Sequence, residues 1–234
     1  MTRLEVACFN YKSACSAIEL GAHRIEFASR YLGGGVTPNL SELAQLTQQT
    51  HVPVHVLIRC RDGNFVYNHS ELLQMQHEIE MAVEAGAAGL VFGCLDANNE
   101  INIQANQFLL AAAKHIPCTF HRAFDVLPNY SVGLNQLMDM GFNAVLTSGS
   151  NKNAWDGRAT LAQLLVQADK KIEVICGGGV RSKHLNEFLE TTQTNWIHAA
   201  CINSLDESID AQELSQMLFI LKQHNNFHEP KNLS

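Results

Sequence analysis

The sequence predicts an α/β protein that folds as a single closed (β/α)8 barrel. Short β-rich apolar runs alternate with longer helical runs, this strand–helix unit occurs eight times, and the last unit ends in a helical run. Because each crossover helix returns the chain to the same edge of the sheet, the strands are expected to be parallel. An open doubly wound sheet could be built from the same units, but eight units in roughly 250 residues favour a closed barrel.

The eight expected strands are short runs rich in β-branched, aromatic and other apolar residues. Their first residues lie 20 to 36 positions apart, which is enough for one strand, one helix and two short loops. The expected strands are Leu4–Cys8, Arg24–Ala28, Pro53–Arg59, Gly89–Gly93, Cys118–Ala123, Ala144–Thr147, Ile172–Cys176 and Trp196–Ala200.

The helical runs between these strands have recognisable ends. Asn39 precedes a run with apolar residues at 40, 43 and 46, and Glu42 follows it at the spacing of a capping box. Ser70 is expected to open a helix with apolar positions 72, 73, 75, 79 and 83, and the last helix is expected over about 211–223. The glycines expected to end helices are Gly21, Gly86 and Gly141.

The barrel is expected to occupy residues 1–225 as one domain, followed by a frayed polar tail over 226–234. The chain is 46% hydrophobic and 17% charged, which is typical of a globular protein and excludes disorder. Its net charge of −7 argues against nucleic acid as a partner, because phosphate binding needs clustered Lys and Arg.

No membrane partner is expected either. The longest apolar stretches fall far short of the roughly 20 residues that cross a bilayer. The N-terminus reaches the carboxylate of Glu5 before any apolar run, so no signal peptide is expected. The seven cysteines are odd in number and lack CxxC spacing, which disfavours a disulfide framework and favours reduced thiols in a cytoplasm.

Polar side chains gather at the carboxyl ends of the expected strands, where a barrel of this kind carries its functional residues. Burying an unpaired charge there costs several kcal/mol. The polar set could form structural ion pairs, such as Glu5 or Glu26 with Arg59 or Arg122, but its convergence from six strands favours a functional site. The set comprises Glu5, Glu26, His55, Arg59, Arg61, His121, Arg122, Asp125, Thr147, Ser148, Gly149 and His198.

A glycine triplet follows the seventh expected strand and precedes a helix. The loops after strands 7 and 8 of a barrel often bind phosphate through backbone N–H groups, which glycine leaves accessible. The alternative is a tight turn that requires positive φ. The candidate anion-binding residues, together with the loop after strand 6, are Thr147, Ser148, Gly149, Gly177, Gly178, Gly179 and Arg181.

Several motifs resemble the CutC family of copper homeostasis proteins, in order over residues 3–204. They are G-A-H-R-I-E-F (21–27), G-G-G-V-T-P-N (33–39), V-H-V-L-I-R-C-R (54–61), G-L-V-F-G-C-L (89–95), T-F-H-R-A-F-D (119–125), L-T-S-G (146–149) and G-G-G-V-R (177–181). The resemblance implies a cytoplasmic TIM barrel, usually a homo-oligomer with a dimer favoured, that takes part in copper homeostasis and binds copper.

Two positions depart from the family pattern. Many members have Glu-Leu-Cys where this chain has Glu26-Phe27-Ala28, so a cysteine often suggested as a copper ligand is missing. Many also have Ile-Arg-Pro-Arg where this chain has Ile58-Arg59-Cys60-Arg61. The matching residues are carboxylates, guanidinium groups, imidazole and loop glycines, a set that suits an anionic organic ligand better than Cu(I).

Two functions from different classes therefore follow. The first, implied by the resemblance, is copper handling through thiols near the mouth, for which the candidate metal ligands are Cys8, Cys60 and Cys201. The alternative is that these cysteines are small buried side chains that pack in the core as hydrophobic residues.

The second function, which the residues favour, is an enzyme acting on a small phosphorylated or carboxylated substrate without a nucleotide cofactor. Glu26 or His121 would move a proton, with Asp125 orienting the imidazole, for a rate gain of about 10²–10⁴-fold. Arg59 or Arg122 could bind a second carboxylate through paired N–H groups. Isomerisation, lyase chemistry and hydrolysis all remain open.

Overall fold

The strands form a closed parallel barrel in sequence order, as predicted. The computed structural model describes residues 1–203 and 206–228. Its strands are β1 (Arg3–Cys8), β2 (Arg24–Phe27), β3 (Val54–Leu57), β4 (Gly89–Phe92), β5 (Cys118–Phe120), β6 (Ala144–Thr147), β7 (Glu173–Cys176) and β8 (Trp196–Ala199). Because β1 pairs with both β2 and β8, no sheet edge is left open.

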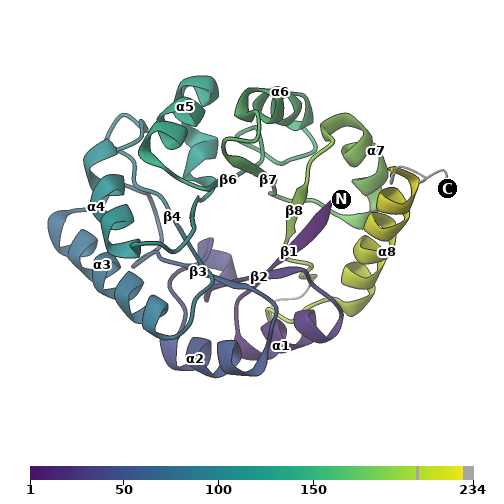
Figure 1. The fold of residues 1–234 in the computed structure, drawn as a ribbon, viewed down its shortest axis with the longest axis horizontal. Coiled ribbons are helices and arrows are strands. Elements are labelled where there is room, and N and C mark those ends of the chain that lie inside the picture. The colour runs from purple at the N-terminus through teal and green to yellow at the C-terminus, as the bar shows by residue number, and fades with distance from the viewer. Residues whose placement is uncertain (204–205, 229–234) are drawn as a thin grey trace.

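The helices form a ring around this barrel (Figure 1). They are α1 (Tyr11–Glu19), α2 (Leu40–Gln49), α3 (His69–Glu84), α4 (Ile103–Ala113), α5 (Tyr130–Met140), α6 (Arg158–Ala168), α7 (Ser182–Thr192) and α8 (Ala211–His228). Two short 3₁₀ turns, η1 (Tyr31–Gly33) and η2 (Arg122–Val126), follow β2 and β5. No helix within 1–203 and 206–228 is both long and apolar enough to cross a membrane.

The capping box lies at a different helix from the one expected. Asn68 caps α3, its side chain accepting from the N–H of Glu71 while the Glu71 carboxylate accepts from the N–H of Asn68. The helix therefore begins before Ser70, the residue expected to open it. Asn39 does cap α2, but its side chain accepts from the N–H of Ser41, and no reciprocal bond is found there among the described residues.

The expected helix ends at glycine are confirmed. Gly21, Gly86 and Gly141 have φ of +100°, +87° and +89°, the left-handed conformation that reverses the chain after a helix. The last helix continues past the expected end at Gln223 to His228, so residues 226–228 of the expected frayed tail are helical. Residues 229–234 lie outside the described part of the chain.

Alternation along each strand gives the barrel wall an outer and an inner face. Val6, Phe27 and Phe92 belong to the large core between strands and helices. The inner face has a smaller apolar cluster with Ala7 and Leu57. The inner face also carries polar residues, all buried: Glu5, Arg24, Glu26, His55 and His198.

Candidate functional site

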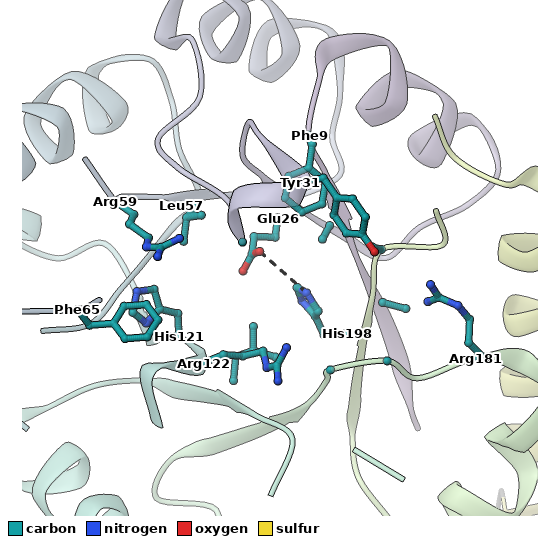
Figure 2. A pocket seen from close by; sticks show the side chains of 17 residues that line it. Phe9, Glu26, Tyr31, Leu57, Arg59, Phe65, His121, Arg122, Arg181 and His198 are labelled. Carbon is teal, nitrogen blue, oxygen red and sulfur yellow. Dashed lines mark ion pairs between the residues drawn. The ribbon is translucent and has the colours of Figure 1, made fainter. Parts of the chain in front are cut away.

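The polar inner face opens into a cavity of about 220 Å³ at the carboxyl ends of the strands. Figure 2 shows the aromatic rings of Phe9 and Tyr31 on one side of it and that of Phe65 on another. The polar side chains that line it are Glu26, Arg59, His121, Arg122, Arg181 and His198. The sequence predicted all six, whereas it did not single out the three aromatic residues.

His198 lies between two carboxylates. Its Nδ1 lies 2.7 Å from Glu5 Oε1. Its Nε2 lies 4.0 Å from Glu26 Oε1, the pair that the dashed line marks in Figure 2. Burial alone would lower the pKa of His198, but Glu26 and Glu5 outweigh burial and raise that pKa above its usual value. Glu5 therefore orients the imidazole and favours its charged form, while the other ring nitrogen faces the cavity side chain of Glu26.

The pKa values of Glu5 and Glu26 are shifted in opposite directions because the two carboxylates have different partners. Burial would raise the pKa of Glu5, but Arg24 and His198 lower it to about 2. Burial raises the pKa of Glu26 to about 7, and His198 opposes that rise only in part. No hydrogen bond to the Glu26 carboxylate is found among residues 1–203 and 206–228. Glu5 is thus a paired, ionised carboxylate, whereas Glu26 is a buried carboxyl whose pKa lies near neutral pH.

Arg24 is the partner of Glu5, and the sequence analysis did not identify it. Its Nε lies 2.5 Å from Glu5 Oε2, whereas the sequence suggested Arg59 or Arg122 as arginine partners of the buried carboxylates. The alternation of side chains along a strand could have identified Arg24 as an inward-facing residue, because Arg24 and Glu26 are two residues apart on β2 and so share a face.

His121 is held as a neutral imidazole. Its Nδ1 accepts a hydrogen bond of 3.3 Å from the N–H of Ala123, which places the ring proton on Nε2. That Nε2 is buried and has no hydrogen-bond partner in the described part of the chain. Burial, together with the charge of Arg59, lowers the pKa of His121 to about 3. His121 is therefore a hydrogen-bond donor at neutral pH and does not carry a proton as a base would.

Asp125 does not orient the imidazole of His121, contrary to the prediction. Its Oδ1 accepts from Thr147 Oγ1 at 2.6 Å, and Oδ2 accepts from Ser148 Oγ at 2.7 Å and from Arg122 Nε at 2.8 Å. These bonds tie η2 to the end of β6 and hold Arg122 at the cavity.

The loop after β6 is held by internal hydrogen bonds. The Ser148 N–H also donates to Asp125, and the Gly149 N–H donates to Thr147 Oγ1. None of these three loop residues lines the cavity. The predicted anion-binding roles of Thr147, Ser148 and Gly149 therefore gain no support from this geometry.

Two predicted arginines are occupied by structural contacts. Arg59 Nη1 donates to the carbonyls of Gly33 and Gly35, and Nη2 donates to the carbonyl of Gly63 at 2.7 Å, so Arg59 joins two loops at the cavity rim. Arg61 pairs with Glu71 outside the cavity. The buried Nε of Arg59 keeps no hydrogen-bond partner among the described residues, whereas Arg61 does not line the cavity.

His55 is buried on β3, and it does not line the cavity. Its ring occupies the space that a Cβ on Gly89 would need, and burial lowers its pKa to about 4. It therefore packs the barrel interior as a neutral side chain.

The glycine loop after β7 is only partly free. The Gly177 N–H donates to the carbonyl of Thr147, and the first amide of α7, that of Ser182, donates to the Glu213 carboxylate. Gly178 and Gly179 line the cavity, and their N–H groups have no acceptor within the described residues.

Arg181, the other predicted anion ligand, also lines the cavity. It donates to the carbonyls of Val180 and Ile202 at 3.2 Å. Its guanidinium is therefore tied to the backbone at the rim.

The three predicted thiol ligands do not form one group that could share a metal ion within the described residues, although Cys8 and Cys201 are near enough to interact electrostatically. Cys8 and Cys201 are fully buried in the core outside the barrel wall, where Cys201 contacts Met217. Cys60 is partly buried beside Cys94, and none of the three predicted thiols lines the cavity. Within the described ranges, the one group of three His, Cys, Asp or Glu donors near enough to share a metal ion is Glu5, Glu26 and His198, with ligand atoms within 4.8 Å of one another.

Comparison with known proteins decides the family. The sequence model of the CutC family matches residues 2–203. The chain belongs to the CutC family. A CutC protein of Glaesserella parasuis is 34% identical over 92% of this chain and 88% of its own length. A mouse relative named copper homeostasis protein CutC homolog is 37% identical over 88% of this chain and 76% of its own.

A solved CutC structure has the same barrel. The crystal structure of CutC from Streptococcus agalactiae superimposes with a TM-score of 0.82 at 31% identity, covering 86% of this chain and 99% of that one. The fold and family expected from the motifs are thereby confirmed.

Proposed function

We propose that this CutC-family protein is an enzyme that transfers a proton to or from a small organic anion bound at the barrel mouth. The observation that carries the proposal is Glu26, a buried carboxylate of pKa about 7 that faces both the cavity and His198. A pKa near the working pH is what general acid–base catalysis requires. Glu5 holds His198 in place, so a proton can pass between Glu26, His198 and a ligand.

A purely structural role explains Glu26 poorly. A structural carboxylate gains from its partners, as Glu5 does from Arg24 and His198, and its pKa falls. Glu26 shows the opposite, because burial raises its pKa and no donor compensates among the described residues. A carboxylate kept in a costly environment beside a cavity supports a catalytic use.

Glu26→Gln is expected to reduce turnover about 10²–10⁴-fold, because glutamine keeps the shape of the side chain and cannot carry the proton. The protein would be incubated in D2O with a panel of small phosphorylated and carboxylated compounds, and proton NMR would follow deuterium incorporation and new products. Glu19→Gln, an exposed position on α1, is the matched control. Equal turnover by Glu26→Gln and the native chain would overturn the proposal.

Copper binding is a second candidate, favoured by the mouse relative's name and by one donor set in this chain. Two carboxylates and an imidazole suit a divalent ion, whereas Cu(I) selects thiolates. No thiol of the described residues lines the cavity, and Cys8, Cys60 and Cys201 are apart from it, so the residues do not fit Cu(I) there. The donor types fit Cu(II) at Glu5, Glu26 and His198.

If Cu(II) binds to Glu5, Glu26 and His198, His198→Gln should weaken the affinity for Cu(II) about tenfold or more, and Cys60→Ser should leave that affinity unchanged. Calorimetric titration of the native chain and both variants measures this. Cu(II) binding that survives His198→Gln, or that Cys60→Ser abolishes, rules out this copper site. A cytoplasmic location and a homo-oligomer, implied by the family resemblance, stay predictions.

A further inference from the structure

We propose that the ligand of this cavity is a phosphate monoester with a second oxygen function. Arg122 and the N–H groups of Gly178 and Gly179 would bind the phosphate, and His121 would donate a hydrogen bond to the second oxygen. This inference rests on the proposed function and names its substrate class.

Arg122 is the cation that the structure keeps available. Its Nε is fixed by Asp125 at 2.8 Å, which orients the guanidinium plane. Both Nη groups lack an acceptor in the described part of the chain, and Figure 2 shows the side chain directed into the cavity near His198. A fixed guanidinium with two free Nη groups suits an oxyanion.

Gly178 and Gly179 place backbone against the same space. They have φ of +98° and +82°, and because glycine has no side chain, the part that lines the cavity is backbone. The carbonyl of Gly178 is turned to the N–H of Ala154, 2.8 Å away. A Cβ on Gly178 would lie 3.0 Å from Arg122 Cζ, so glycine is what lets the guanidinium approach this backbone. Consecutive free N–H groups beside an arginine form an anion-binding concavity.

His121 supplies an independent indication of a ligand. His121 is 5% exposed, and its ring lines the cavity. Its protonated Nε2 has no hydrogen-bond partner among the described residues. Leaving a buried donor unpaired costs about 1–3 kcal/mol. An acceptor oxygen of a bound molecule removes that cost.

The charge of the lining favours an anion. Three guanidinium groups line the cavity, those of Arg59, Arg122 and Arg181, whereas Glu26 is the one carboxylate that lines it in the described ranges. Arg122 also opposes protonation of His198. A dianion beside Arg122 would neutralise this effect, which couples anion binding to the proton-transfer pair.

The first test is calorimetric titration of the full chain with inorganic phosphate and, separately, acetate. Phosphate should bind, and Arg122→Gln should weaken it about tenfold to hundredfold, with Arg122→Lys intermediate. Arg3→Gln is the control, because Arg3 begins β1 at the end of the strand away from the cavity, and it should not change phosphate binding. Three results would overturn the phosphate site. They are no binding of phosphate by the native chain, equal phosphate affinity in Arg122→Gln and the native chain, and acetate binding as tight as phosphate binding.

The second test compares inorganic phosphate with 2-phosphoglycolate, which adds a carboxylate as the second oxygen function. The native chain should bind 2-phosphoglycolate more tightly. His121→Asn keeps an acceptor for the Ala123 N–H but removes Nε2, so it should abolish the added affinity while leaving phosphate binding in place. An unchanged preference in His121→Asn would exclude the second contact.

These binding results separate the two proposals. Glu26→Gln should retain phosphate binding, because it removes no donor to the anion. Phosphate binding without any effect of Glu26→Gln on turnover would sink the proposed function alone. Turnover that depends on Glu26 without phosphate binding would sink this inference alone.

Discussion

At pH 8, Glu26→Gln is expected to raise the free energy of unfolding by about 3 kcal/mol relative to the native chain. The pKa of Glu26 is about 7 in the folded protein against an ordinary value of 4.5. Folding therefore favours the protonated carboxyl. The stability that this proton contributes is complete below pH 4.5 and is lost as the pH rises through 7, while glutamine has no proton to lose.

Urea denaturation of both proteins at pH 4 and pH 8 measures this effect. The two stabilities should be similar at pH 4 and should diverge at pH 8. Glu19→Gln, on the surface of α1, should change stability little at either pH. A Glu26→Gln protein that is less stable than the native chain at pH 8 would show that the carboxylate is a favourable structural partner. A Glu26→Gln protein that is more stable than the native chain would show that Glu26 lowers the stability of the fold, as residues kept for catalysis often do.

The barrel could be predicted because its signal repeats along the chain. Each strand is a short apolar run, and the mouth residues could be placed from the strand ends alone. Strand alternation would also have excluded one thiol. Glu5 and Ala7 face inward, so Cys8 must face the helices, as it does.

The partners of the site residues could not be predicted, because they come from elements that meet only in the folded barrel. The carboxylate of Asp125 reaches the next strand, β6, and leaves His121 to a local bond with Ala123. The guanidinium of Arg59 is used by carbonyls of two loops, at Gly35 and Gly63. Sequence position gives the end of the barrel at which a group lies, and tertiary contacts decide whether it is free.

Glu5→Gln is expected to destabilise the protein by about 3–5 kcal/mol at pH 7. The Glu5 and Arg24 side chains are 2% and 8% exposed, so removing the negative charge leaves a buried guanidinium whose nearest remaining carboxylate, that of Glu173, lies 3.9 Å away. The variant also removes one of the two carboxylates, Glu26 and Glu5, that favour charged His198. The cost arises from the uncompensated charge, which a surface pair does not leave behind.

Denaturation at pH 7 compares Glu5→Gln with Asp62→Asn, which breaks the exposed pair with Arg30 and should cost about 0–1 kcal/mol. The pH dependence gives a second readout. The pKa of Glu5 falls from 4.5 to about 2 on folding, so its stabilisation is present above pH 4.5 and is lost as the pH falls towards 2. Glu5→Gln should lack that acid-dependent loss. A cost below about 1 kcal/mol, or an unchanged acid profile, would mean that Arg24 and His198 do not depend on Glu5, and His198 would then lack the fixed orientation that proton transfer with Glu26 requires.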